Sequence, residues 1–186
     1  MLDGAMIWID IETTGLDPVR DRILEIGLMI TDASGAVVYG KQNALIWNST
    51  AELSFTQADA WVKKTHERNG LIAECMESGV DIQVAEDQLV GFLADHGVNL
   101  HKKDNNHLCG SSVHFDQKFI KEHTIGLSSI FHYRMVDITT LKLLCEELNP
   151  DLYMRMPKKQ ALHRALPDLK DTINEYAFYR QNFLVH

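Results

Sequence analysis

The stretch from Ile7 to Pro18 constrains the fold most strongly, because an apolar run leads into two acids and then into a turn. Asp10 and Glu12 lie two positions apart, and residues at i and i+2 of a β-strand project from the same face. Two ionised carboxylates at such a distance repel each other unless a pKa rises or a cation lies between them. Mg²⁺ and Mn²⁺ prefer carboxylate oxygens. The pattern therefore indicates a divalent-cation site at the end of a buried strand or, alternatively, a pair of solvated acids.

The pattern of the whole chain predicts an α/β fold, with a mixed five-stranded sheet flanked by helices. The first three strands are close in sequence and should form an antiparallel meander, whereas the later strands alternate with helices. Strands are expected at 5–11, 22–31, 36–47, 107–110 and 133–137. Helices are expected at 56–68 (beginning at an N-cap, Thr56), 71–77, 82–95, 114–123, 138–148 and 167–181, with a loop at 151–162.

Length and composition exclude several classes of protein. The 186 residues are expected to form one domain, and no apolar run approaches the roughly 20 residues that span a bilayer. The segment Met1 to Ala5 has no basic region, so we expect no signal peptide. The three cysteines, Cys75, Cys109 and Cys145, lack a C-x-x-C spacing and favour free thiols in a reducing cytoplasm.

The charge balance restricts the choice of partner. Lys and Arg total 18 against 26 Asp and Glu, which gives a net charge of −8. This balance argues against tight, non-specific binding of long duplexes, because neutralised phosphates supply that affinity. A nucleic-acid substrate would therefore be a short one.

A third acid, Asp116, follows Gly110 by six residues. Because Gly110 ends an expected strand, Asp116 can point back over the sheet edge where Asp10 and Glu12 are expected. The alternative is an ordinary acid in the first turn of a helix, where the helix dipole stabilises it.

His163 and Asp168 form a further candidate pair. Their separation of five residues would not place both side chains on one helical face. Pro167 lies between them, and proline favours the first helical turn and disfavours helix at Leu166. We therefore expect His163 on the entering loop and Asp168 in the first turn, where both can reach one point. Without this context, a single histidine is more often a surface or core residue.

Together these motifs resemble those of the DEDDh exonucleases, and most closely the oligoribonucleases. Asp10-Ile-Glu12-Thr-Thr-Gly, Asp116 after Gly-Ser-Ser, and His163-x4-Asp168 occur in the same order and with comparable spacing. The resemblance covers nearly the whole chain. Further matching segments are Ile7-Trp-Ile-Asp10, Thr14-Gly-Leu-Asp-Pro18, Asp21-Arg-Ile-Leu-Glu-Ile26, Ala60-Trp61, Phe131-His-Tyr-Arg134, Asp137-Ile-Thr-Thr-Leu-Lys142 and His163-Arg-Ala-Leu166.

The resemblance implies a ribonuclease-H-like fold over residues 1–186. It also implies a cytoplasmic, homodimeric 3′-to-5′ exoribonuclease that hydrolyses very short RNA, especially dinucleotides, to 5′-nucleoside monophosphates. The implied catalytic residues include His163 as the general base. The implied ligands of two divalent ions, Mg²⁺ or Mn²⁺, are Asp10, Glu12, Asp116 and Asp168.

The same resemblance implies a set of substrate contacts. Leu16 would wedge between two bases, Trp61 would stack on a base, and His66 would face the substrate. For Trp61 the alternative is a core residue on a helix face. The residues implied around the 5′ end of a dinucleotide are Ser112 and Thr139 of one subunit, and Tyr133 and Arg134 of the other.

Three residues depart from the oligoribonuclease pattern. Thr13 replaces the usual methionine, Ser111 the usual asparagine, and Pro167 a frequent acid. None is an implied metal ligand, but Thr13 and Ser111 leave an alternative open. This is a broader 3′-exonuclease, similar to ribonuclease T or a proofreading exonuclease, that acts on single-stranded DNA or RNA ends. A catalytically silent binding module is a further alternative, although unused clustered acids cost stability.

Overall fold

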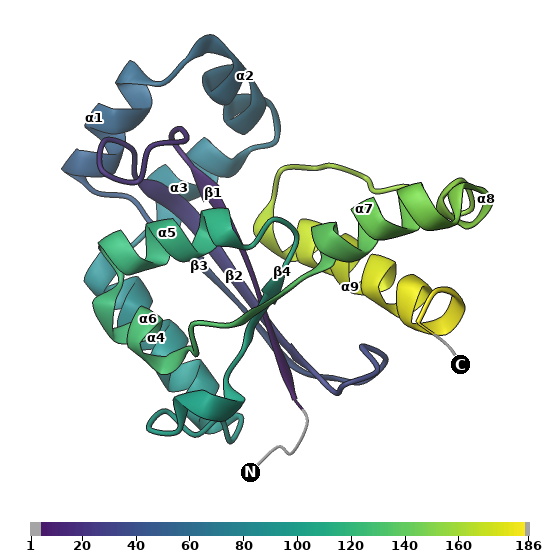
Figure 1. Cartoon of the computed structure of the whole chain (residues 1–186). Coiled ribbons are helices and arrows are strands. Elements are labelled where there is room, and N and C mark those ends of the chain that lie inside the picture. The colour runs from purple at the N-terminus through teal and green to yellow at the C-terminus, as the bar shows by residue number, and fades with distance from the viewer. Residues whose placement is uncertain (1–4, 185–186) are drawn as a thin grey trace.

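A computed structural model describes residues 5–184 and places a five-stranded sheet at the centre of the molecule (Figure 1). The order across the sheet is β3-β2-β1-β4-β5, antiparallel within β3-β2-β1 and parallel for β1-β4 and β4-β5. This confirms the predicted meander and the mixed sheet. The strands are β1 (Met6–Thr13), β2 (Ile23–Thr31), β3 (Val38–Leu45), β4 (Leu108–Gly110) and β5 (Met135–Asp137).

Three groups of helices surround the sheet (Figure 1). One face is covered by α4 (Ile82–Asp95), α5 (His114–His123) and α6 (Ile125–Ile130). A short 3₁₀-helix (Lys103–Asn105) lies in the chain between α4 and α5. The other face is covered by α7 (Ile138–Leu148), α8 (Pro150–Tyr153) and α9 (Ala165–Asn182). The helices α1 (Ser49–Gln57), α2 (Ala60–Arg68) and α3 (Leu71–Ser78) lie at the end of the sheet where β1 finishes.

The alternation of β1 divides the core into two layers. Ile7, Ile9 and Ile11 lie in the apolar cluster that includes residues of α4, α5 and α6. Trp8 lies in the opposite cluster, with Leu169 and other residues of α9. Because side chains alternate along a strand, Asp10 and Glu12 share the face of Trp8 and are directed toward α9.

The predicted helix at 56–68 is wrong at its start and in its N-cap, Thr56, whereas its end at Arg68 is confirmed. Two helices occupy this region, and each begins at an earlier or later cap. Asn48 caps α1 and Asp59 caps α2, since each side-chain oxygen accepts hydrogen bonds from two backbone N–H groups. Thr56 lies inside α1, where its hydroxyl donates to the carbonyl of Leu53 at 2.7 Å.

The C-terminal predictions also need correction. Part of the expected loop at 151–162 is helical, because Asn149 accepts from the N–H of Leu152 at 3.1 Å and starts α8. The helix α6 was not predicted. The last helix begins at Ala165 rather than at 167, so Leu166 is helical despite the proline after it. A proline in the first turn removes no intrahelical hydrogen bond, and Asp168 lies in that turn as expected.

The helices and the N-terminal residues bear on the predictions of no membrane span and no signal peptide. Among residues 5–184, none of the helices combines the length and the apolar character that crossing a bilayer requires. The prediction of no signal peptide rests mainly on residues 1–4, which lie outside the described residues.

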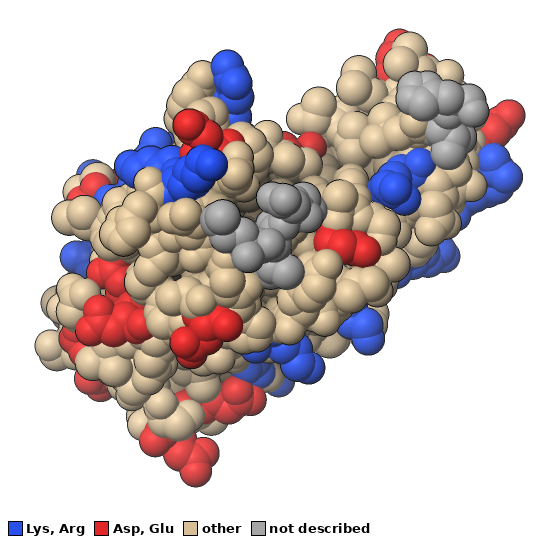
Figure 2. All heavy atoms as spheres, turned by 90° about the horizontal axis from the view of Figure 1, so that it is seen from below, with Lys and Arg blue, Asp and Glu red and all other residues tan. Residues whose placement is uncertain are grey.

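The lower end of the molecule carries mixed charge. Figure 2 shows this face, where Lys and Arg form small groups separated by Asp, Glu and neutral residues. A surface for long duplexes needs a broad basic area that neutralises phosphates, and the described residues visible on this face form none.

The start of α9 packs very closely on β2 at Gly27. A Cβ atom on Gly27 would lie 2.8 Å from Cβ and 3.1 Å from the carbonyl carbon of Ala165. We therefore expect Gly27→Ala to displace the start of α9 and to lower the free energy of unfolding by about 1–3 kcal/mol, as overpacking commonly does. Urea unfolding measures this loss. Gly91→Ala on α4 is the matched control, because its Cβ would meet nothing within 4 Å. Equal stability of the two variants would contradict the close packing.

Candidate active site

Asp10 and Glu12 form the base of the site on β1. In the register with β2, Asp10 is opposite Gly27 and Glu12 is opposite Glu25. The absent side chain at Gly27 leaves room for the start of α9 above the two acids. A register shift after Glu12 ends the regular pairing and turns the chain into the following loop.

Asp116 reaches the same position from α5. The N–H of Ile11 donates to Oδ1 of Asp116 at 3.0 Å, although the two residues are 105 positions apart. Ile11 lies between Asp10 and Glu12, so the Asp116 carboxylate meets β1 at the two acids. Asp116 lies in the first turn of α5 and its side chain is buried. The sequence offered two alternatives for Asp116, an acid in a first helical turn and an acid directed at the sheet edge, and Asp116 is both.

Asp168 and His163 approach from the start of α9. Oxygen or nitrogen atoms of Glu12, His163 and Asp168 all lie within 4.8 Å of one another. The N–H of Leu162 donates to Oδ1 of Asp168 at 3.3 Å, which ties the entering loop to the first turn of α9. The structure therefore brings together all five residues that the sequence motifs singled out for catalysis.

The carboxylates of this cluster all have raised pKa values. Burial, followed by the charges of Asp168 and Glu25, raises the pKa of Glu12 to about 8. Burial and neighbouring acids likewise raise the pKa of Asp10, and burial is the main cause for Asp116 and Asp168. Among the described residues, no Lys or Arg forms an ion pair with Asp10, Asp116 or Asp168. An excess of buried negative charge with oxygen ligands alone fits a divalent-cation site.

His66 lies behind the carboxylates. Its ring is buried, and Nε2 lies 3.2 Å from the carbonyl oxygen of Thr13 and 3.7 Å from Oε2 of Glu12. A buried ring in this position offers almost no surface to a base. Its contacts instead connect α2 to the end of β1.

Leu16 and Trp61 are exposed apolar side chains, Leu16 on the loop that follows β1 and Trp61 on α2. Their exposed fractions are 82% and 60%. The edge of the Trp61 ring contacts the ring of His163, with centroids 5.2 Å apart. Trp61 is thus not a core residue but a surface residue next to His163.

Ser112 and Thr139 meet at the ends of β4 and β5. The N–H of Ser112 donates to Oδ1 of Asp137 and to Oγ1 of Thr139, both at 2.8 Å, and the two hydroxyl oxygens are 3.0 Å apart. Ser112 has a φ of +53°, a conformation that is sparsely populated outside glycine and is found in functional loops.

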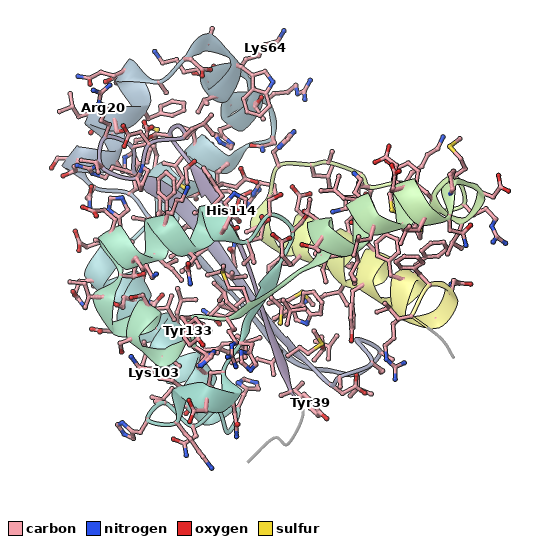
Figure 3. All side chains as sticks on the ribbon, in the orientation of Figure 1. Arg20, Tyr39, Lys64, Lys103, His114 and Tyr133 are labelled. Carbon is pink, nitrogen blue, oxygen red and sulfur yellow. The ribbon has the colours of Figure 1, made fainter. Side chains whose placement is uncertain are left out.

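Tyr133 and Arg134 lie elsewhere in the same chain. They precede β5, whereas Thr139 follows it, so β5 separates Tyr133 and Arg134 from the hydroxyl groups of Ser112 and Thr139. Figure 3 shows Tyr133 near α4 and α6, away from His114 at the start of α5. Tyr133 is 69% exposed, and Cζ of Arg134 lies 5.2 Å from the centroid of its ring.

Sequence reasoning missed one acid of the site. Glu25 is buried on β2, opposite Glu12, and pairs with Arg164. The signal was present, because Glu25 interrupts a continuous apolar run from Ile23 to Ile30. An acid in such a run is buried and must find a partner.

Comparison with known sequences identifies relatives over nearly the full chain. The exonuclease family of the RNase T type matches residues 7–176. An oligoribonuclease from Sodalis glossinidius is 37% identical over 182 residues, which cover 98% of this chain and 97% of that protein. A mitochondrial oligoribonuclease from Mus musculus is 37% identical over 180 residues, which cover 95% and 72%.

Comparison with solved structures supports the same fold. Escherichia coli exonuclease I in complex with a dT13 oligonucleotide has a TM-score of 0.70 and 13% identity. The zinc-bound form of its complex with single-stranded DNA has a TM-score of 0.69 and 13% identity. Each match covers 97% of this chain and 41% of that protein, so the chain spans about two fifths of exonuclease I. The ribonuclease-H-like fold expected from the sequence is confirmed.

Proposed function

The chain belongs to the exonuclease family and, within it, to the oligoribonucleases, and we propose that dinucleotides are the preferred substrates of this 3′-to-5′ exoribonuclease. The observation that supports the catalytic assignment best is the approach of Glu12, His163 and Asp168 within 4.8 Å. Half-buried acids and an imidazole at such distances serve hydrolysis of a phosphodiester, because the reaction needs both cations and a base.

The enzyme uses divalent metal, and we assign the ligands to Asp10, Glu12, Asp116 and Asp168. All four supply carboxylate oxygens, which Mg²⁺ and Mn²⁺ prefer, and we propose two such ions per chain. When bound, the two cations supply Lewis-acid stabilisation of the attacking and leaving oxygens. The raised pKa values of the four acids support this assignment, since clustered carboxylates hold protons more tightly when no cation offsets their negative charge.

His163 serves as the general base. Its ring lies beside Glu12 and Asp168, so a water molecule held among these groups has a proton acceptor next to it. The imidazole takes one proton as the water oxygen bonds to phosphorus. The bond from phosphorus to the O3′ of the preceding nucleotide breaks, O3′ is protonated from solvent, and a nucleoside 5′-monophosphate leaves.

Leu16 and Trp61 hold the bases in this proposal. Both are exposed apolar side chains, Leu16 on the loop after Glu12 and Thr13, and Trp61 in contact with His163. Stacking of a base on an aromatic ring contributes about 1–3 kcal/mol and tolerates any base. Leu16 would separate the two bases, and Trp61 would stack on the base of the 3′ nucleotide. His66 supports the end of β1, and with it the carboxylate of Glu12, through its contacts with Thr13 and Glu12.

In this proposal the pocket for the 5′ end of the substrate is completed only in a homodimer. Ser112 and Thr139 present hydroxyl groups on one chain, while Tyr133 and Arg134 lie beyond the other end of β5. A second copy can bring its own Tyr133 and Arg134 to this site. The guanidinium of Arg134 suits a terminal phosphate, since its planar fork binds two oxygens at once. A pocket closed in this way selects substrates by length.

We also propose that residues 1–186 form a single exonuclease domain that acts in the cytoplasm. Cys75, Cys109 and Cys145 are buried free thiols. Free thiols are typical of a reducing compartment, which supports this location.

A length series of 5′-phosphorylated RNA tests the preference for dinucleotides. We expect kcat/KM for a dinucleotide to exceed that for a pentanucleotide at least about tenfold, a difference of about 1.4 kcal/mol, with Mg²⁺ or Mn²⁺. The physical reason is the closed 5′ pocket, which a longer chain cannot enter without collision. Initial rates of mononucleotide release measure the ratio. Equal rates for both lengths, or faster cleavage of single-stranded DNA, would favour the broader exonuclease.

Arg134→Ala provides the control for this prediction. The variant should lose most of the discrimination between phosphorylated and unphosphorylated dinucleotides, because the phosphate contact disappears. Sedimentation of the variant shows whether the dimer persists. Unchanged discrimination in a dimeric variant would remove Arg134 from the pocket.

A further inference from the structure

The backbone that carries His163 has an uncommon conformation. Ala161 and His163 have φ values of +50° and +53°, in the left-handed region that few residues other than glycine adopt. Such a backbone persists only where its surroundings fix it. Because the ring of His163 must meet Glu12 and Asp168, the groups that hold this segment determine where the base lies.

Asn69 holds the carbonyl side of this segment. It follows α2, and its side-chain Nδ2 donates to the carbonyl oxygen of His163 at 2.6 Å and to that of Leu162 at 3.2 Å. Its Oδ1 accepts from the N–H of Leu71 at 3.1 Å, at the start of α3. One amide therefore connects the junction of α2 and α3 to the backbone of His163, 94 positions away.

Arg164 anchors the residue that follows. Its guanidinium lies 3.2 Å from Glu25 on β2 and 2.6 Å from Glu74 on α3. The N–H of Ala165 donates to the same Glu25 carboxylate at 2.9 Å. These contacts fix the chain after His163, so Asn69 is the group that fixes the carbonyl of His163 itself.

We propose that Asn69 is a positioning residue for the general base. Its amide keeps the peptide of His163 in the left-handed conformation, which directs the imidazole to Glu12 and Asp168. The proposal rests on the proposed role of His163. Asn69 acts through the backbone of His163, so its loss should reduce turnover rather than substrate binding. Trp61 lies on α2, the helix that Asn69 follows, and contacts the His163 ring, so base stacking and placement of the imidazole share one support.

The variant Asn69→Asp removes the donor and keeps the acceptor. Aspartate keeps an oxygen for the N–H of Leu71 but replaces the donating amide with an oxygen that repels both carbonyls. With a 5′-phosphorylated dinucleotide and Mn²⁺, we expect kcat to fall about 10–100-fold, the effect of a small misplacement, while KM stays within twofold. Hydrogen–deuterium exchange of metal-free protein should be faster over residues 160–166.

Two comparisons complete the experiment. Asn149→Asp is the matched control, because Asn149 also accepts from a backbone N–H at a helix start but lies between α7 and α8, outside the site. It should leave kcat and the exchange over residues 160–166 unchanged. Asn69→Ala adds no charge and should lower kcat by a similar factor, and it decides the question if Asn69→Asp does not fold.

The outcomes separate this proposal from the function on which it rests. If wild-type protein cleaves the dinucleotide and both variants of Asn69 keep kcat within twofold, the positioning role is overturned while the exonuclease remains. A rise in KM with unchanged kcat also overturns it, since that result assigns Asn69 to binding. Failure of wild-type protein to cleave any RNA overturns the function itself.

Discussion

The kcat of His163→Ala should fall about 10²–10⁴-fold below that of the wild-type chain, because the variant lacks the base that takes the proton of the attacking water. The KM for a dinucleotide should change little, since binding depends on the exposed Leu16 and Trp61. The melting temperature should also change little, because the ring of His163 is partly exposed and lies against the exposed Trp61. Steady-state kinetics with Mn²⁺ measures the loss.

Controls make this result specific to the base. His101→Ala removes an exposed histidine on the segment between α4 and β4 and should leave kcat unchanged. Added imidazole should restore part of the lost rate in His163→Ala, because it can enter the space that the ring vacates. Turnover within tenfold of wild type in the folded variant would contradict the assignment of His163.

Stability of the metal-free protein should fall as pH rises, and divalent cations should reverse this fall. The pKa of Glu12 is raised from 4.5 to about 8 by burial and neighbouring acids, so between these values the folded chain holds a proton that the unfolded chain has released. Stability gained from that proton is present at low pH and is lost as pH rises through the window. Cations bind the ionised form, so Mg²⁺ or Mn²⁺ should stabilise the protein more at pH 8 than at pH 6.

Thermal unfolding with and without chelator at several pH values measures this effect. Glu12→Gln should melt at least about 3 °C above wild type at pH 8 without metal, since roughly 1 kcal/mol corresponds to 2–4 °C in a chain of this size. The variant should lose the stabilisation by cations and almost all activity. Glu52→Gln, an exposed acid on α1, should behave as wild type. Parallel pH dependence in Glu12→Gln and wild type would refute the raised pKa of Glu12.

The sheet could be predicted because its signals are local. The apolar runs of the first strands and the short turn at 32–35 specify the antiparallel meander, and the structure has it. The helices near 56–68 were predicted less well, because Asn48, Asp59 and Thr56 are all good N-cap residues. Only packing decides which of them starts a helix. The apolar residues of α1 to α3, among them Phe55 and Leu71, pack on Leu24 of β2 and select the first two caps.

The sequence by itself determined the chemical groups of the site and the shared face of Asp10 and Glu12, because the period of a strand is fixed by covalent geometry. Tertiary structure alone decided that Asp116 reaches Ile11 across 105 positions, and that His163 arrives in a left-handed conformation beside Glu12. These meetings depend on how α5 and α9 pack on the sheet. The raised pKa values follow from the same packing, since burial and mutual distance exist only in the folded chain.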